Sequence, residues 1–172
     1  MTARQAPAPN RRWPAEWEPH DATWLSWPHN EEDWPGKFGP IDWAFAEIVR
    51  LVAGRDDGPG ERVEVLCHNE DVLRRARERC TQAGALMSRV RLHLCATDRG
   101  WLRDIGPTVV RVGKGLELID WRFNAWAKYD NFALDDAVPE LVERLTKLPR
   151  VEAMRPGSAE RFVMEGGAIE TD

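Results

Sequence analysis

Several features that mark other protein classes are missing from this sequence of 172 residues. No apolar run approaches the length of a membrane span, and residues 1–12, rich in Ala, Pro and Arg, lack the apolar core of a secretory signal. Basic residues are not in excess, because 24 Lys and Arg against 29 Asp and Glu give a formal charge of −5. This balance argues against a phosphate-backbone binder. We therefore expect a cytoplasmic protein without a membrane or nucleic-acid partner. We also expect residues 1–12 to form a disordered tail.

Cysteine is scarce and its spacing fits no known site. Cys67, Cys80 and Cys95 form no CxxC pair or other metal-ligand spacing, and the sequence contains no HExxH, Walker, GxGxxG or GxSxG motif. An odd number of cysteines without a signal peptide indicates reduced thiols, which we expect to pack in the core. These absences point away from the common metal, nucleotide and serine-hydrolase sites.

The residues that are present indicate one soluble domain with a real core. Hydrophobic residues make up 42% and charged residues 31% of the chain. Tryptophan is abundant: six of the nine lie between Trp13 and Trp43. Such a cluster fits either a thick core edge or an aromatic-lined cleft, and the sequence does not separate these two interpretations.

Apolar spacing predicts strands that alternate with helices, which is the pattern of an α/β fold. Expected strands cover 22–27, 61–67, 90–95, 108–112, 116–121, 151–154 and 161–164. Expected helices cover 41–53, 70–83 with Asn69 as N-cap, and a third that Asp135 and Asp136 begin and that ends near 148. Glycines at 113 and 115 predict a hairpin, so the sheet is not purely parallel.

The stretch from Trp101 to Pro107 is the strongest functional candidate. It places an aromatic ring, the cation of Arg103 and the carboxylate of Asp104 within four residues, in an expected loop between two strands. A Trp beside an Asp suits a planar cation that stacks on the ring and is held by the carboxylate. The alternative is a turn with a core Trp and a surface Arg–Asp pair.

A second carboxylate, Glu165, precedes paired glycines at 166 and 167. Such glycines remove side chains where a ligand or another backbone approaches closely. A Gly-rich turn with a solvated Glu is the alternative. Together with Asp104, Glu165 would suit a guanidinium, whose five N–H donors lie in one plane. Because the sequence stops at Asp172 in an expected extended segment, we expect a fragment of a longer protein.

Six ordered segments resemble the agmatine deiminase family, which groups with bacterial peptidyl-arginine deiminases. They are PAEWEPH (14–20), TWLSWPHN (23–30), WLRDIGP (101–107), DWRFNAW (120–126), LDD (134–136) and FVMEGG (162–167). The resemblance implies the pentein fold, a five-bladed α/β propeller, with residues 13–172 as roughly the first half of its five modules. It also implies hydrolysis of the guanidinium of agmatine or peptidyl-arginine to a ureido group and ammonia, in putrescine biosynthesis.

The same resemblance assigns roles to individual residues. It implies that Asp104 and Glu165 bind the guanidinium nitrogens as catalytic carboxylates. The implied substrate-binding residues are Trp101, Trp27, Asn124, Trp126 and Gly166. No metal or organic cofactor is implied, and a homo-oligomer of the longer protein is compatible with the family. Where the family usually has glycine and serine, this chain has Ala127 and Ala168.

The family's nucleophilic Cys and its His–Asp pair have no counterpart in these 172 residues. We therefore expect this chain to be inactive alone, with the binding half of the site and not the reacting half. The alternatives are a non-catalytic guanidinium-binding or interaction module, and an arginine deiminase or amidinotransferase of the same fold. The Trp-rich N-terminal segment favours agmatine or peptidyl-arginine over the latter pair.

Overall fold

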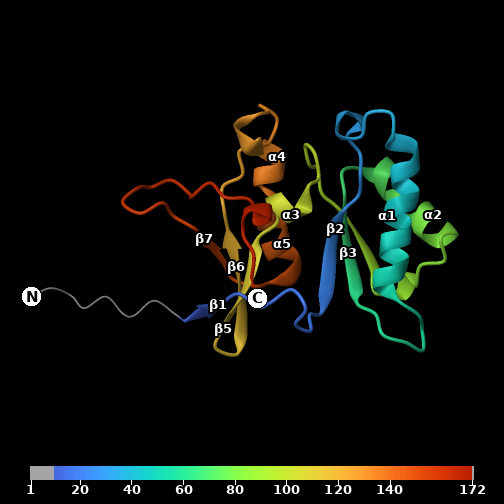
Figure 1. Ribbon diagram of the computed structural model, residues 1–172, viewed down its shortest axis with the longest axis horizontal. Helices are drawn as coiled ribbons and strands as arrows, with labels where there is room; N and C mark the ends of the chain where they lie inside the picture. Colours follow the sequence, from blue (N-terminus) through green and yellow to red (C-terminus); the bar gives the residue numbers. More distant parts are fainter. Residues whose placement is uncertain (1–9, 172) are drawn as a thin grey trace, which may run out of the picture.

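Two β-sheets lie side by side in the computed structural model, which describes residues 10–171 (Figure 1). The strands are β1 (Arg11–Arg12), β2 (Ala22–Ser26), β3 (Arg62–Cys67), β4 (Val90–Leu94), β5 (Thr108–Val112), β6 (Gly115–Asp120) and β7 (Arg150–Glu152). The α-helices are α1 (Phe38–Ala53), α2 (Glu70–Gln82), α3 (Leu102–Ile105), α4 (Ala133–Asp136) and α5 (Val138–Thr146). The expected mixed α/β architecture is confirmed.

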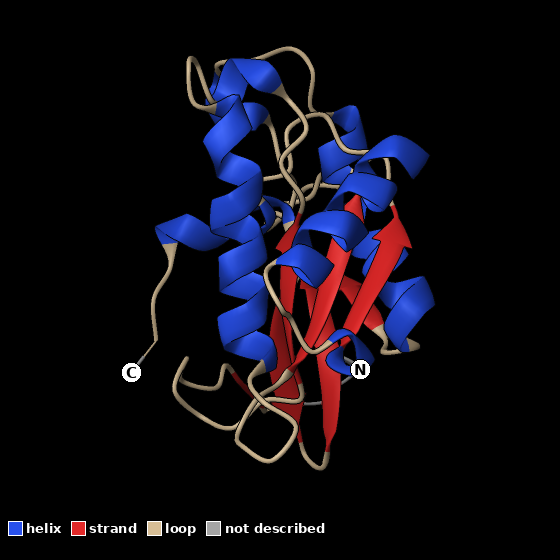
Figure 2. Ribbon diagram, turned by 90° about the vertical axis from the view of Figure 1, so that its right-hand side faces the viewer, coloured by secondary structure: helices blue, strands red, loops and turns tan. Residues whose placement is uncertain are grey.

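The first sheet has the order β2-β3-β4 and is entirely parallel. Helices α1 and α2 cover its outer face, and Figure 2 shows them in front of the strands. Val63, Val65 and Cys67 alternate along β3 toward these helices, where they pack in the first core. Asn69 caps α2 as expected, since its side chain accepts a hydrogen bond from the Val72 N–H at 2.9 Å.

The other face of β3 joins the two halves of the molecule. Leu66 is fully buried there and packs with Leu118 of β6 and with Val138 and Val142 of α5 in the second core. Helix α3 lies between the two sheets, close to the centre of Figure 1. The position of α3 therefore depends on both halves.

The second sheet has the order β1-β5-β6-β7. Strands β5 and β6 form the predicted antiparallel hairpin, and β7 pairs with β6 in parallel after the α4–α5 crossover. Strand β1 pairs with β5, so Arg11 and Arg12 lie in a sheet and not in the tail expected at 1–12. Residues 1–9 of that expected tail lie outside the described residues.

Three sequence-based predictions differ from the structure. The expected loop at 101–107 contains one helical turn, α3. Asp135 and Asp136 do not cap the third helix: they end α4, and α5 begins at Val138 after a break. The expected strand at 161–164 forms only isolated bridges at Arg161 and Val163. Within residues 10–171, no helix is both long enough and apolar enough to cross a bilayer.

Candidate functional site

A cavity of about 460 Å³ opens where three segments meet, one after β2, one after β4 and one after β6. Its lining residues are Glu32, Asp33, Trp101, Asp104, Trp126, Lys128 and Tyr129. The carboxyl ends of parallel strands in α/β sheets commonly hold ligands, because the loops that leave them diverge around a crevice. Three of the residues predicted from sequence therefore come together here: Trp101, Asp104 and Trp126.

The α3 turn places Trp101 and Asp104 on the cavity wall. The Trp101 ring stacks on Trp34, with centroids 5.3 Å apart and planes 28° apart. Trp101 nevertheless remains partly accessible, since 38% of the residue is exposed. Arg103 forms its ion pair with Glu16 and not with Asp104. The alternative of a surface Arg–Asp pair is therefore wrong, and Asp104 has no ion-pair partner within residues 10–171.

The paired glycines allow the Glu165 turn to pack directly against α3. A Cβ added at Gly166 would lie 2.1 Å from the Arg103 carbonyl oxygen, and one at Gly167 would lie 2.6 Å from Asp104 Oδ1. The Gly167 N–H donates a hydrogen bond to that same oxygen at 3.1 Å. The predicted close approach is confirmed: Gly166 lies against the backbone of α3, and Gly167 lies against the Asp104 carboxylate. Glu165 is half-buried beside this contact, although its side chain is not part of the cavity lining.

Trp126 reaches the cavity on a strained backbone. Ala125, Trp126 and Ala127 have φ values of 51°, 57° and 53°, a left-handed run that non-glycine residues rarely adopt. Asn124 stabilises this turn, because its side chain accepts a hydrogen bond from the Ala127 N–H at 3.3 Å. The Asn124 side chain thus orients the loop and does not line the cavity.

Trp27 is placed elsewhere. It is completely buried in the first core, and its indole N–H donates a 2.8 Å hydrogen bond to Asp42 Oδ1. Its ring packs edge-on against Phe45 of α1. The structure therefore gives Trp27 a packing role and does not bring it to the cavity.

Four lining residues were not foreseen: Glu32, Asp33, Lys128 and Tyr129. The acidic run at 31–33 was a visible signal, but nothing in the sequence linked it to residues almost one hundred positions later. Behind these residues lies Arg99, which is 6% exposed and pairs with Asp33. Arg99 has its backbone N–H bonded to the buried carboxylate of Asp135, whose pKa burial raises to about 6.

No cysteine or histidine is part of the lining of this cavity in the described residues. Burial raises the pKa of Cys67 to about 12 and that of Cys80 to about 11, and also raises that of the half-buried Cys95. None of these thiols is suited to form a nucleophilic thiolate near neutral pH. Nor do residues 10–171 contain a group of three or more side chains placed to hold a metal ion.

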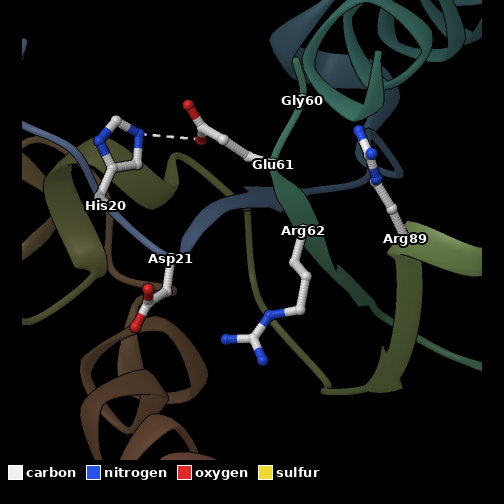
Figure 3. Close-up of a pocket in the computed structure, with 6 residues that line it drawn as sticks. All are labelled: His20, Asp21, Gly60, Glu61, Arg62 and Arg89. Atoms are coloured by element: carbon white, nitrogen blue, oxygen red, sulfur yellow. Dashed lines mark ion pairs between the residues drawn. The ribbon is translucent and has the colours of Figure 1, made fainter. Parts of the chain in front are cut away.

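A separate cavity of about 530 Å³ lies at the opposite, amino-terminal ends of β2, β3 and β4 (Figure 3). Its walls are polar, and His20 pairs there with Glu61 at 2.9 Å. The guanidinium of Arg89 donates hydrogen bonds to the carbonyl oxygens of Ala53 and Gly58. No aromatic ring that could stack on a guanidinium, other than the His20 imidazole, lines this cavity. The smaller cavity is therefore the better candidate for guanidinium recognition.

Known proteins match this chain over nearly its whole length. The model of the Porphyromonas-type peptidyl-arginine deiminase family matches residues 12–172. An agmatine deiminase of Stutzerimonas stutzeri is 33% identical over 165 residues, which is 92% of this chain and 40% of the relative. The chain thus spans about two fifths of the length of the curated relatives it matches.

Solved structures agree in fold. The agmatine deiminase of Enterococcus faecalis matches 94% of this chain and 41% of its own, with a TM-score of 0.75 and 22% identity. A substrate-bound C315S agmatine deiminase of C. jejuni matches 97% of this chain and 44% of its own, with a TM-score of 0.73 and 22% identity. By the family model, the chain belongs to the Porphyromonas-type peptidyl-arginine deiminase family, and it is similar to curated agmatine deiminases.

Proposed function

We propose that the cavity binds the guanidinium group of agmatine or of a peptidyl-arginine, and that the longer protein hydrolyses it to a ureido group and ammonia. The observation that carries this proposal is the pairing of Trp101 with Asp104 on one wall. Trp101 offers a partly exposed ring, and Asp104 offers a carboxylate with no ion-pair partner in the described part of the chain. A planar cation satisfies both groups at once.

The chemistry of such a site follows from the substrate. A guanidinium carbon is a poor electrophile because its positive charge is delocalised over three nitrogens. Carboxylates that accept its N–H groups hold the carbon in place for attack and favour the cationic, more electrophilic form. Asp104 Oδ1 already accepts from Gly167, which leaves Oδ2 for the substrate. We assign Glu165, on the turn that this hydrogen bond holds in place, to the remaining guanidinium N–H groups.

The reacting groups would come from the rest of the protein. Hydrolysis requires a thiolate that attacks the guanidinium carbon and an acid that protonates the departing ammonia. Within this proposal the full fold is the five-bladed pentein propeller, with residues 13–172 as about its first half. The reaction then belongs to the route from arginine to putrescine, and a homo-oligomer is compatible with it.

A non-catalytic guanidinium-binding module is the second candidate. It is favoured by the observation that neither a cysteine nor a histidine lines the cavity in residues 10–171. Both candidates share the binding step and differ in turnover. Ammonia release by the longer protein would support the hydrolase, and binding without release would support the module.

Calorimetry on the 172-residue chain tests the shared step. We expect saturable binding of agmatine or acetyl-arginine amide, weakened about tenfold or more by Asp104→Asn, because a charge-assisted hydrogen bond is lost. Asp71→Asn is the matched control, since this exposed carboxylate of α2 pairs with Arg74 and lies outside the cavity. Equal affinity of the native chain and Asp104→Asn would contradict the proposal.

A further inference from the structure

Two adjacent carboxylates of α4 connect this helix to the segments around the candidate site. Asp135 is completely buried and accepts hydrogen bonds from the backbone N–H groups of Asp98 and Arg99 at 2.8 and 3.1 Å. Those two residues shortly precede Trp101 and Asp104 in the chain. Helix α4 is thereby fixed relative to the wall of the cavity on which Asp104 lies.

The second carboxylate, Asp136, bonds to two other segments. Its Oδ1 atom accepts a hydrogen bond from the Phe123 N–H at 2.8 Å, and its Oδ2 atom pairs with the guanidinium of Arg161. The Trp126 ring packs edge-on against Phe123, with centroids 5.3 Å apart. Arg161 lies four residues before Glu165. One carboxylate therefore connects the segment of Trp126 with the segment of Glu165.

Arg161 bridges two carboxylates that come from different elements. Its Nη1 atom donates to Asp120 Oδ1 at 2.8 Å, and its Nη2 atom donates to Asp136 Oδ2. Asp120 is buried at the end of β6, and its other oxygen pairs with Arg150 of β7. A guanidinium suits this bridge because its planar fork presents N–H groups in fixed directions. Arg161 therefore holds the start of its segment against both β6 and α4.

Glu165 lies between two anchors. Arg161 fixes the start of the segment, and the hydrogen bond of the Gly167 N–H to α3 fixes its end. Phe162 and Val163, between these points, are exposed, so apolar burial contributes little to the position of the segment. Its backbone pairs through isolated bridges and not through a continuous ladder. The place of Glu165 thus depends strongly on the ion pairs of Arg161.

Resting on the proposed function, we propose that Arg161 is a positioning residue that holds Glu165 in place for a guanidinium ligand. It does so by bridging Asp120 and Asp136. Arg161 does not line the cavity, so its removal acts on ligand affinity through the position of Glu165.

A double-mutant cycle with 1-butylguanidine, measured by calorimetry on the 172-residue chain, tests this role. Arg161→Met should weaken binding about tenfold, because Glu165 is no longer held, and Glu165→Gln should weaken it by a similar factor. Adding Arg161→Met to Glu165→Gln should weaken binding by less than about twofold more, because the two residues act through one interaction. A purely structural role would give the same factor in both backgrounds.

Arg150→Met is the matched control. It removes the other cation of the buried Asp120, together with an ion pair to Glu143 of α5, and Arg150 is not part of the cavity lining. Its stability in urea should fall at least as far as that of Arg161→Met, while its affinity for 1-butylguanidine should stay within about twofold of the native value.

Asp136→Asn provides a second route to the same interaction if Arg161→Met fails to fold. Asparagine keeps an oxygen for the Phe123 N–H but has no charge for Arg161. It should weaken binding of 1-butylguanidine about threefold or more in the native background, and by a smaller factor when Glu165 is already glutamine.

The possible failures are distinct. A native chain that does not bind 1-butylguanidine would refute the proposed function and this role together. Binding by the native chain, with unchanged affinity in a folded Arg161→Met variant, would refute the role of Arg161 and leave the guanidinium site in place. Equal factors in the two Glu165 backgrounds, or an equal loss in Arg150→Met, would refute positioning through Glu165.

Discussion

Gly166→Ala should damage stability and ligand binding together. The added Cβ would lie 2.1 Å from the Arg103 carbonyl oxygen, which is backbone and cannot rotate away. The 166–168 turn must therefore move off α3, and the Gly167 N–H loses Asp104 Oδ1, now at 3.1 Å. Overpacking costs about 1–3 kcal/mol. The lost hydrogen bond to a half-buried carboxylate adds about 1 kcal/mol.

Urea unfolding followed by tryptophan fluorescence measures the first effect. A loss of about 2–4 kcal/mol, divided by a slope of about 2 kcal/mol per molar urea, lowers the unfolding midpoint by about 1–2 M. Calorimetry with 1-butylguanidine measures the second effect, which we expect to be about tenfold weaker binding, because Asp104 is no longer oriented by the turn.

Gly115→Ala provides the control for the glycine substitution itself. Gly115 begins β6 outside the left-handed region, and a Cβ there would make only an ordinary contact, 3.7 Å from the Val112 carbonyl oxygen. Glycine weakens a strand relative to alanine by about 0.5–1 kcal/mol, so this variant should be at least as stable as the native chain. If Gly166→Ala keeps both the native midpoint and the native affinity, the close packing of α3 against the turn is refuted as the origin of the Asp104 geometry.

Three further predictions concern strain, pH and thiol reactivity. Ala127→Gly should stabilise the chain by about 1 kcal/mol in urea unfolding, because Ala127 has a φ of 53° that glycine adopts without penalty; an unchanged or lower midpoint would argue against strain. Burial raises the pKa of Asp135 from 3.8 to about 6, so the folded chain binds a proton at this carboxyl more tightly than the unfolded chain does. The free energy of unfolding therefore falls as the pH rises from about 4 to 6. Asp135→Asn should remove a dependence on the order of 3 kcal/mol from that window, and an identical pH profile of the unfolding midpoint would contradict this. Cys67 and Cys80 are fully buried with raised pKa, so at pH 8 a disulfide reagent should modify at most one thiol, Cys95, until urea unfolds the chain; rapid reaction of all three would refute their burial.

The regular elements were predictable where the sequence repeats a pattern over several residues. Alternation along β3 and the N-cap of α2 each depend on neighbours in the sequence, and both are confirmed. Helix α3 was not predicted because four residues are too few to show a helical period. The apolar run at 162–164 looked like a strand, yet Phe162 is 45% exposed and forms no ladder. A run of apolar residues alone therefore does not determine whether a segment pairs as a strand in a sheet.

The residues of the candidate site were likewise predictable where they are neighbours in the sequence, and were missed where only folding brings them together. Trp101 and Asp104 were found because one short segment carries both, and the paired glycines were correctly interpreted as a place of close approach. Trp27 was not separable from a rim residue by sequence, since the face of a residue at a strand end is set by the helix that packs there. Asp33 and Arg99 were missed because they lie 66 positions apart and meet only in the folded chain.

Ligand binding and folding should therefore be coupled in this chain. Asp104 lies on a single turn of helix, and an isolated turn is unstable because its nucleus orders several residues for few hydrogen bonds. Helix α3 is instead held by Ile105 in the second core, which Leu66 of the first sheet and Leu118 of the second sheet share. A substitution that loosens this shared core, such as Leu118→Ala, removes about 2–5 kcal/mol of packing energy far from any ligand atom. It should nevertheless weaken guanidinium binding, because the orientation of Asp104 depends on the docking of one sheet against the other.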